Sequence, residues 1–290
     1  MAAGVRWIFC PLPTALCLLL FATSALAQDR YTPIAPLPLG DTLLTLPTSH
    51  IPAQGAWEIK FTHRFNESID GNDRLHSLFG LDSNADVLFG FSYAPRRALQ
   101  LSLARSNTND TIEGAVKYIV LQQAQAVPGS LALRVGGDWR SEKDLGDRAS
   151  WFAQAILSRQ IGRKAEFFVL PTFVTKAGRA VAGTESLALF DDAFNVPIGF
   201  AYRIKPALSV VAEIIPPNND LPDEVDAEFG WAIGIKRAIG GHYFEILLTN
   251  SNGSTVDQYT TSTYQGAPFN HGDIHLGFNI ERRFGRRPRH

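Results

Sequence analysis

Apolar and polar residues alternate with a period of two in twelve segments of the chain. Trp57–Phe65 shows the pattern most clearly, because aromatic and aliphatic residues take alternate positions and polar residues lie between them. Neighbouring side chains of a strand point to opposite faces, so each segment predicts a strand between apolar and polar surroundings. The predicted strands are Trp57–Phe65, Ala85–Tyr93, Ala98–Arg105, Ile112–Leu121, Ser130–Trp139, Trp151–Arg159, Ala165–Val174, Ala193–Ile204, Ala207–Ile215, Ala227–Arg237, His242–Thr249 and Asp273–Phe284.

The connections between these segments are sorted by length. Long connections such as Asn66–Asn84, Thr175–Asp192 and Asn250–Gly272 alternate with short ones such as Lys205–Pro206 and Ala238–Gly241. Outer-membrane barrels have long outer loops and short periplasmic turns. The sorting therefore favours a barrel over a soluble sandwich, and Ser106–Thr111 is the one short connection in an outer position.

Aromatic residues cluster at both ends of the predicted strands, as expected for two belts at the membrane interfaces. The alternative is the aromatic core of a soluble β protein. The predicted periplasmic belt comprises Trp57, Tyr93, Tyr202, Tyr243, Phe244 and Phe284, and the outer belt comprises Phe65, Trp139, Trp151, Phe173, Phe194, Phe229 and Trp231.

The first 27 residues are typical of a secretory signal peptide. Arg6 supplies the positive charge, Leu16–Phe21 is the apolar stretch, and Ala25–Ala27 is a small-residue cleavage site. The alternative is an uncleaved anchor, but the apolar stretch is shorter than the ~20 residues of a membrane helix. Both cysteines, Cys10 and Cys17, lie within this segment, which leaves no cysteine for disulfides, metal sites or catalysis in the mature chain.

The remaining chain divides into three parts. Residues 28–54 are rich in proline and predict an extended periplasmic lead-in, residues 55–284 predict the barrel, and residues 285–290 form a basic tail that could meet lipid headgroups. Within the lead-in, Asp41–Thr45 faintly resembles the energy-coupling box of large outer-membrane receptors. The chain has no room for a plug domain and a large barrel, so this interpretation is disfavoured.

Several motifs resemble a family of uncharacterised bacterial membrane-bound β-barrel domains of unknown function. The motifs that carry the resemblance are Leu46–Thr48 leading into Gly55, Phe61–Phe65, Leu78–Asp86, Tyr93, Leu103–Ser106 and Lys117–Gln123. The resemblance implies a barrel and an outer-membrane address. It implies no established activity.

The polar faces of the strands carry charges of both signs. The candidate lumen-lining residues are Glu58, Lys60, Arg64, Asp86, Glu113, Lys117, Arg134, Asp138, Arg203, Glu213, Glu228 and Lys236. Twelve strands enclose more space than a filled eight-stranded barrel and less than a porin. A narrow polar conduit and a packed salt-bridge network are both open. Apolar residues predicted to point inward, namely Leu88, Phe168, Leu170, Val211 and Leu247, favour partial filling.

Signals for catalysis or metal binding are weak. His63 is the one histidine near the outer rim on the outward face, and no serine motif accompanies it. His271, Asp273 and His275 have a spacing that suits a metal, but ordinary loop polarity is the preferred interpretation. Loop Leu78–Asp86 could fold inward toward Arg64 or Lys60, or could bind a ligand.

These patterns predict an all-β fold, a single antiparallel transmembrane β-barrel of about 12 strands in a bacterial outer membrane. The expected role is a narrow channel, or a binding or structural barrel, for small solutes, with no enzyme activity and no cofactor. The alternatives are a lipid-directed enzyme and a soluble exported β protein. Expected partners are outer-membrane lipid, the barrel-assembly machinery and small solutes. The near-neutral charge, with 27 basic and 28 acidic residues, gives no reason to expect nucleic acid.

Overall fold

The computed structural model describes residues 37–69, 76, 78–124, 126–141, 149–177, 179–182, 185–188, 192–216, 229–261 and 273–285. The predicted signal peptide, the first part of the predicted lead-in (residues 28–36) and the end of the basic tail (residues 286–290) lie outside these residues. Glu228 and His271, two of the candidate site residues, lie outside them as well.

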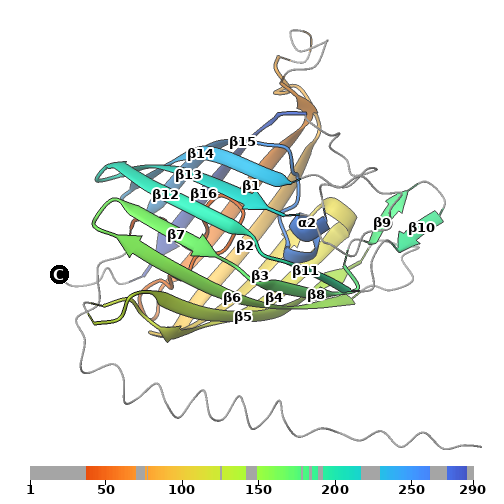
Figure 1. The fold of residues 1–290 in the computed structure, drawn as a ribbon. Coiled ribbons are helices and arrows are strands. Elements are labelled where there is room, and N and C mark those ends of the chain that lie inside the picture. Colours follow the sequence, from red (N-terminus) through yellow and green to blue (C-terminus); the bar gives the residue numbers. More distant parts are fainter. Residues whose placement is uncertain are drawn as a thin grey trace, which may run out of the picture.

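The chain forms a closed antiparallel β-barrel (Figure 1). Its strands are β1 (Trp57–Ser68), β2 (Ala85–Arg96), β3 (Leu99–Ser106), β4 (Thr111–Leu121), β5 (Ser130–Arg140), β6 (Ala149–Ile161), β7 (Ala165–Val169), β8 (Thr172–Thr175), β11 (Asp192–Asn195), β12 (Ile198–Lys205), β13 (Leu208–Ile215), β14 (Gly230–Ile239), β15 (His242–Thr249) and β16 (His275–Phe284). The barrel closes where β1 pairs with β16, from Trp57 opposite Phe284 onward. Closure removes the unpaired sheet edges that a membrane would not tolerate.

Two of the twelve barrel strands are interrupted at neighbouring prolines. β7 and β8 both pair with β6 and are separated at Pro171, and their partners β12 and β11 are separated at Pro197. Proline has no N–H to donate to the ladder. Across the gap, Leu170 N donates to the Pro197 carbonyl at 2.9 Å, which keeps the two broken strands together. The fourteen assigned segments are thus twelve strands.

Every predicted strand corresponds to a strand of the barrel, with ends that differ by a few residues. His242–Thr249 is reproduced without change as β15. The prediction of β6 was the weakest, because Trp151 and Phe152 are both large and apolar. The structure places Trp151 outside, 67% exposed, and Phe152 inside, 4% exposed, so both belong to one strand with an apolar residue on each face.

The sorting of connections is also confirmed. The β6–β7 and β12–β13 turns lie at one end of the barrel, to the left in Figure 1. Helix α2 (Val256–Thr261) and a hairpin of β9 (Arg179–Ala182) and β10 (Glu185–Ala188) lie at the opposite end, to the right. We call these the short-turn end and the long-loop end. Ser106–Thr111, the one short connection in an outer position, contains the 3-10 helix η1 (Thr108–Asp110).

The outer surface of the barrel is apolar, as a lipid-facing surface must be. Phe89 and Ile246 are 62% and 66% exposed, and most of the predicted belt aromatics are exposed, while Trp57 stacks on Phe284 with ring centroids 4.0 Å apart. The prediction that Tyr243 belongs to the periplasmic belt is wrong, because its side chain is buried inside the barrel beside Lys236 and Arg283. No helix among the described residues is long and apolar enough to cross a membrane.

The interior contains the largest departure from the sequence prediction. Residues 37–54, which we call the internal segment, fold into the barrel over residues 37–50 and reach its short-turn end at Gln54, which is exposed and donates to the Pro95 carbonyl. The predicted extended periplasmic lead-in is therefore wrong for residues 37–50. The leucines of the internal segment are buried to 2% exposure or less: Leu37, Leu39, Leu43, Leu44 and Leu46. They join one hydrophobic cluster with inward residues of the wall, including Phe168, Leu170, Val211 and Leu247. Burying a leucine contributes about 1.5–3 kcal/mol, which offsets the cost of ordering the segment.

Candidate functional site

The inner wall of the barrel carries most of the charged residues that the sequence indicated. Glu58, Arg64, Asp86, Glu113, Lys117, Asp138, Glu213 and Lys236 are buried, and Lys60 and Arg134 are partly buried. Arg203 lies at the short-turn end instead, where its guanidinium donates to the Arg163 carbonyl in the β6–β7 turn. The apolar residues predicted to point inward, namely Leu88, Phe168, Leu170, Val211 and Leu247, are all buried, and all except Leu88 belong to the hydrophobic cluster that includes the leucines of the internal segment.

The internal segment is folded into a compact turn before it meets the wall. Leu43 N donates to the Leu46 carbonyl at 2.8 Å, and Thr48 N donates to the Asp41 carbonyl at 2.9 Å. Gly40 precedes the turn at φ +75°, a conformation that suits glycine. The turn pairs Thr42 with Pro47, so the segment satisfies part of its backbone internally. The remaining backbone groups need partners from the barrel.

Glu213 on β13 is the hydrogen-bond partner of three of those backbone groups. Its Oε1 accepts hydrogen bonds from Leu44 N at 2.7 Å and from Thr45 N and Leu46 N, each at 3.0 Å. A carboxylate that accepts several backbone N–H groups makes strong, charge-assisted bonds. Glu213 therefore fixes the tip of the turn to the wall.

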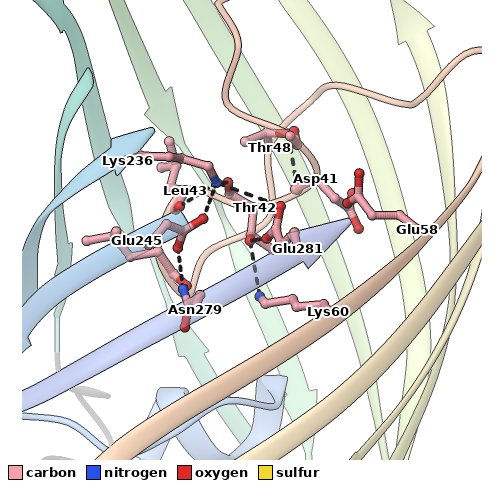
Figure 2. A network of polar contacts seen from close by, with 12 residues as sticks. Asp41, Thr42, Leu43, Thr48, Glu58, Lys60, Lys236, Glu245, Asn279 and Glu281 are labelled. Carbon is pink, nitrogen blue, oxygen red and sulfur yellow. Dashed lines mark hydrogen bonds and ion pairs between the residues drawn. The ribbon is translucent and has the colours of Figure 1, made fainter. Parts of the chain in front are cut away.

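Lys236 on β14 supplies the complementary contacts (Figure 2). Its Nζ donates to the carbonyls of Thr42 at 2.6 Å and Leu43 at 3.0 Å, and forms an ion pair with Glu245 at 2.5 Å. Asn279 donates to the Leu44 carbonyl at 2.7 Å and also to Glu245. One wall network thus holds three consecutive carbonyls of the internal segment.

The side chains of Asp41 and Thr42 in the internal segment add further contacts to the wall. Thr42 Oγ1 donates to Glu281 Oε1 at 2.6 Å and accepts from Lys60 Nζ at 3.1 Å. Asp41 forms an ion pair with Lys117, whose Nζ also donates to the Thr48 carbonyl at 3.1 Å. Burial raises the pKa of Asp41, but the positive charge of Lys117 and its hydrogen bond outweigh burial and hold that pKa below its ordinary value.

A second insert enters the lumen from the long-loop end. The connection of residues 250–261, which we call the α2 connection, includes α2, and Arg140 Nη1 lies 2.5 Å from Asp257 Oδ2. Val256 N donates to Glu113 Oε2 at 2.8 Å, and Asn252 Nδ2 donates to Asp86 Oδ2 at 2.6 Å. Nothing in the period-two pattern indicates this insert. The inward acidic residues, which need donors once they are buried, are the one signal that could have found it.

Between the two inserts a small cavity remains, with a volume of about 70 Å³. Asp41 and Thr42 of the internal segment lie on one side, and Val256 and Tyr259 of the α2 connection lie on another. The wall contributes acidic and basic residues, namely Glu58, Lys60, Glu113, Lys117 and Arg134. Burial raises the pKa of Tyr259, so its hydroxyl is a neutral hydrogen-bonding group here. The cavity could hold water or a small polar solute.

The weaker candidates have other surroundings. His63 faces outward and stacks on Phe278 with centroids 4.9 Å apart. Asp273 is partly exposed and His275 is buried, and no group of three metal-ligating side chains occurs within the part of the chain that the structure describes. The interpretation that loop Leu78–Asp86 folds inward is wrong for its tip, because Leu78 and Phe79 are 59% and 49% exposed. Asp86 points inward, but its partners are Asn252 and Thr108.

Three solved structures that match this chain are outer-membrane proteins. The COG4313 outer membrane channel from Pseudomonas putida F1 is 10% identical, with a TM-score of 0.50 over 87% of this chain and 100% of that chain. The NanC porin is 8% identical, with a TM-score of 0.46 over 79% and 100%. Outer membrane phospholipase A from Escherichia coli is 11% identical, with a TM-score of 0.44 over 80% and 97%. Identities this low concern the fold alone.

No curated protein matches the sequence. A family model for a membrane-bound beta barrel domain (DUF5777) matches residues 40–284, which include most of the internal segment and every barrel strand. The match begins at Gly40, where the compact turn begins, so residues 40–54 of the internal segment belong to the domain together with the strands. This chain is therefore a member of the membrane-bound beta barrel domain family DUF5777.

Proposed function

We propose that this protein is a narrow outer-membrane channel for small polar solutes, and that the internal segment restricts the passage. The observation that carries the proposal is the cavity of about 70 Å³ that remains in the lumen between the two inserts, lined by charges of both signs. A cavity of this size would admit solutes of a few heavy atoms. Mixed charge gives little overall preference between cations and anions.

The way in which the internal segment is attached to the wall supports the proposal that this segment can move and change the width of the passage. Its backbone is joined to the wall by hydrogen bonds to Glu213, Lys236 and Asn279, and no strand pairing with the barrel holds it. Hydrogen bonds can be exchanged for water one by one, at a net cost of about 1.5–3 kcal/mol for each bond to a charged group such as Glu213 or Lys236. The barrel ladder would remain intact while the segment shifts, so the passage could widen without unfolding.

A reversible cross-link can test this proposal. Ser49 Oγ of the internal segment lies 2.7 Å from Ser158 Oγ of β6. Cysteines at both positions are within reach of a disulfide, and serine and cysteine are similar in size. In planar lipid bilayers, we expect small openings from the wild-type protein and from the reduced S49C/S158C variant. Oxidation should abolish the openings of the double variant, and reduction should restore them.

The single variants S49C and S158C are the matched controls, since neither can form the cross-link. Openings that persist in the oxidised double variant would contradict gating by the internal segment. A silent bilayer with both the wild-type and the reduced protein would instead support a filled structural barrel, which is the second candidate function. The packed networks around Glu213 and Lys236 favour that candidate.

A passive role, with no enzyme activity, is part of the proposal. It is supported by the surroundings of His63, whose ring packs between Phe65 and Phe278 on the outer surface. The alternative of a lipid-directed enzyme would require lipid hydrolysis that is lost in H63A. The proposed partners are outer-membrane lipid around the apolar surface, the barrel-assembly machinery and the small solutes.

A further inference from the structure

A second polar cavity lies at the short-turn end of the barrel. Its volume is about 100 Å³, which is room for roughly three water molecules at about 30 Å³ each. Ser49 and His50 of the internal segment contribute to its lining, together with Arg97 of the β2–β3 turn, Gln160 of β6 and Glu166 of β7. It is separate from the cavity between the two inserts, and the two share no lining residue.

Glu166 provides a buried acceptor in this cavity. The residue is 3% exposed, and its Oε1 lies 3.0 Å from His50 Nε2. Its Oε2 is buried and accepts no hydrogen bond from the residues that the structure describes. Buried carboxylate oxygens are nearly always paired, because an unpaired one costs free energy. The carboxylate therefore has capacity for a donor that the described chain does not supply.

Arg97 provides the opposite chemistry at the rim. Its side chain is exposed, and among the described residues it has no ion pair with a carboxylate. A guanidinium presents five donors in a planar fork that matches a carboxylate. The amides of Gln123 and Gln160 are already engaged, since Gln123 Nε2 donates to the Gln160 carbonyl at 2.9 Å and Gln160 Nε2 donates to the Gly162 carbonyl at 3.1 Å. Glu166 Oε2 and the Arg97 guanidinium thus remain available to recognise a ligand, while Glu166 Oε1 is already paired with His50.

We propose that this cavity is a binding site for a small zwitterion of the amino-acid class. The ammonium group would donate to Glu166, and the carboxylate would accept from Arg97. The volume limits the ligand to a molecule about as large as alanine. The proposal does not depend on whether the lumen conducts, because it concerns binding at the mouth of the barrel.

Isothermal titration calorimetry of the full-length protein in detergent micelles tests the site, with L-alanine as the probe. Acetate and ethylammonium serve as half-ligands that carry one charge each. We expect saturable one-site binding of L-alanine and at least tenfold weaker binding of either half-ligand, since each lacks one charge-assisted contact. R97Q and E166Q should each weaken L-alanine binding by about tenfold or more.

R96Q is the matched control, because Arg96 is an exposed neighbour that does not line the cavity; it should bind like the wild type. Heat-modifiable migration in gels verifies that each variant is folded. If E166Q fails to fold, R97Q still tests the site, because it changes only an exposed side chain. No binding of L-alanine to the wild type would overturn the proposal. Unchanged binding in R97Q, or half-ligands that bind as tightly as L-alanine, would overturn it as well.

Discussion

Lys236 and Glu245 lie opposite each other on β14 and β15, with Nζ 2.5 Å from Oε1 and both side chains fully enclosed in the lumen. The pair does more than neutralise two charges of the wall. Lys236 also donates to two carbonyls of the internal segment, and Asn279 bonds to both Glu245 and that segment. The ion pair is therefore part of the attachment between the wall and its insert.

Substitution of Lys236 by methionine should destabilise the protein strongly. It would leave Glu245 buried without its cation, and the loss of one partner of a buried pair costs about 3–5 kcal/mol. Unfolding by guanidinium chloride in detergent micelles should show a correspondingly lower midpoint. Arg237 is the adjacent exposed residue, and R237M should leave the midpoint almost unchanged. Equal stability of K236M and R237M would contradict the role assigned to the pair.

Substitution of Glu213 by glutamine should loosen the internal segment without unfolding the barrel. An amide is nearly the same shape and can keep its oxygen at the Oε1 position, but it is uncharged, so its bonds to Leu44–Leu46 are weaker. Its NH₂ group would then face Thr45 N, which donates to Oε2 at 3.1 Å in the wild type. We expect a loss of about 1–3 kcal/mol of docking free energy. A single cysteine at Thr45 should then react faster with maleimide in E213Q/T45C than in T45C alone. Equal reaction rates would show that Glu213 does not hold the segment.

A lysine on the outer surface should be tolerated according to its depth in the membrane. Ile246 lies midway along β15 and is 66% exposed, and Ile239 is the last residue of β14 at the short-turn end, 46% exposed. I246K should cost about 2–4 kcal/mol, and I239K about 0–1 kcal/mol, because the cost falls toward the interface. Urea unfolding in lipid vesicles measures both. A similar loss of unfolding free energy in I246K and I239K would contradict the placement of Ile246 in the hydrocarbon core and of Ile239 near the membrane interface.

The barrel could be predicted from the sequence because its determinants are local. Each strand needs apolar residues at alternate positions, and Phe89 and Ile246 satisfy that need through lipid alone, with no specific partner. Tyr243 shows where this reasoning fails. An aromatic at a strand end suits a belt, but the residue after it, Phe244, has the outward position, and Tyr243 packs in the lumen against Arg283 and Lys236.

The internal segment could not be predicted in the same way, because its contacts are distant in sequence. Leu44 N and Glu213 are 169 residues apart, and Thr42 and Glu281 are 239 residues apart. The segment has no strand or helix period that would reveal a buried face. Gly199 gave one indirect signal, since a Cβ there would collide with Leu43. A glycine at an inward strand position marks the close approach of another part of the chain, but it does not tell which part.

Acid should release the internal segment through Asp41. The pKa of this carboxyl lies below its ordinary value of 3.8, so its charged form favours the folded state. That stabilisation is fully present above pH 3.8 and is lost as the pH falls through the lowered pKa. Pepsin is active in this range, and the Leu43–Leu44 bond is a suitable target. We expect pepsin to cleave the internal segment faster at low pH, by more than the rate changes for an unstructured peptide substrate over the same pH range.

The D41N variant has no charge at position 41 at pH 5 or at lower pH. Its internal segment should therefore be cleaved faster than that of the wild type at pH 5, and its cleavage rate should change less when the pH is lowered. If D41N and the wild type responded equally to pH, the ion pair between Asp41 and Lys117 would not be the contact that acid breaks.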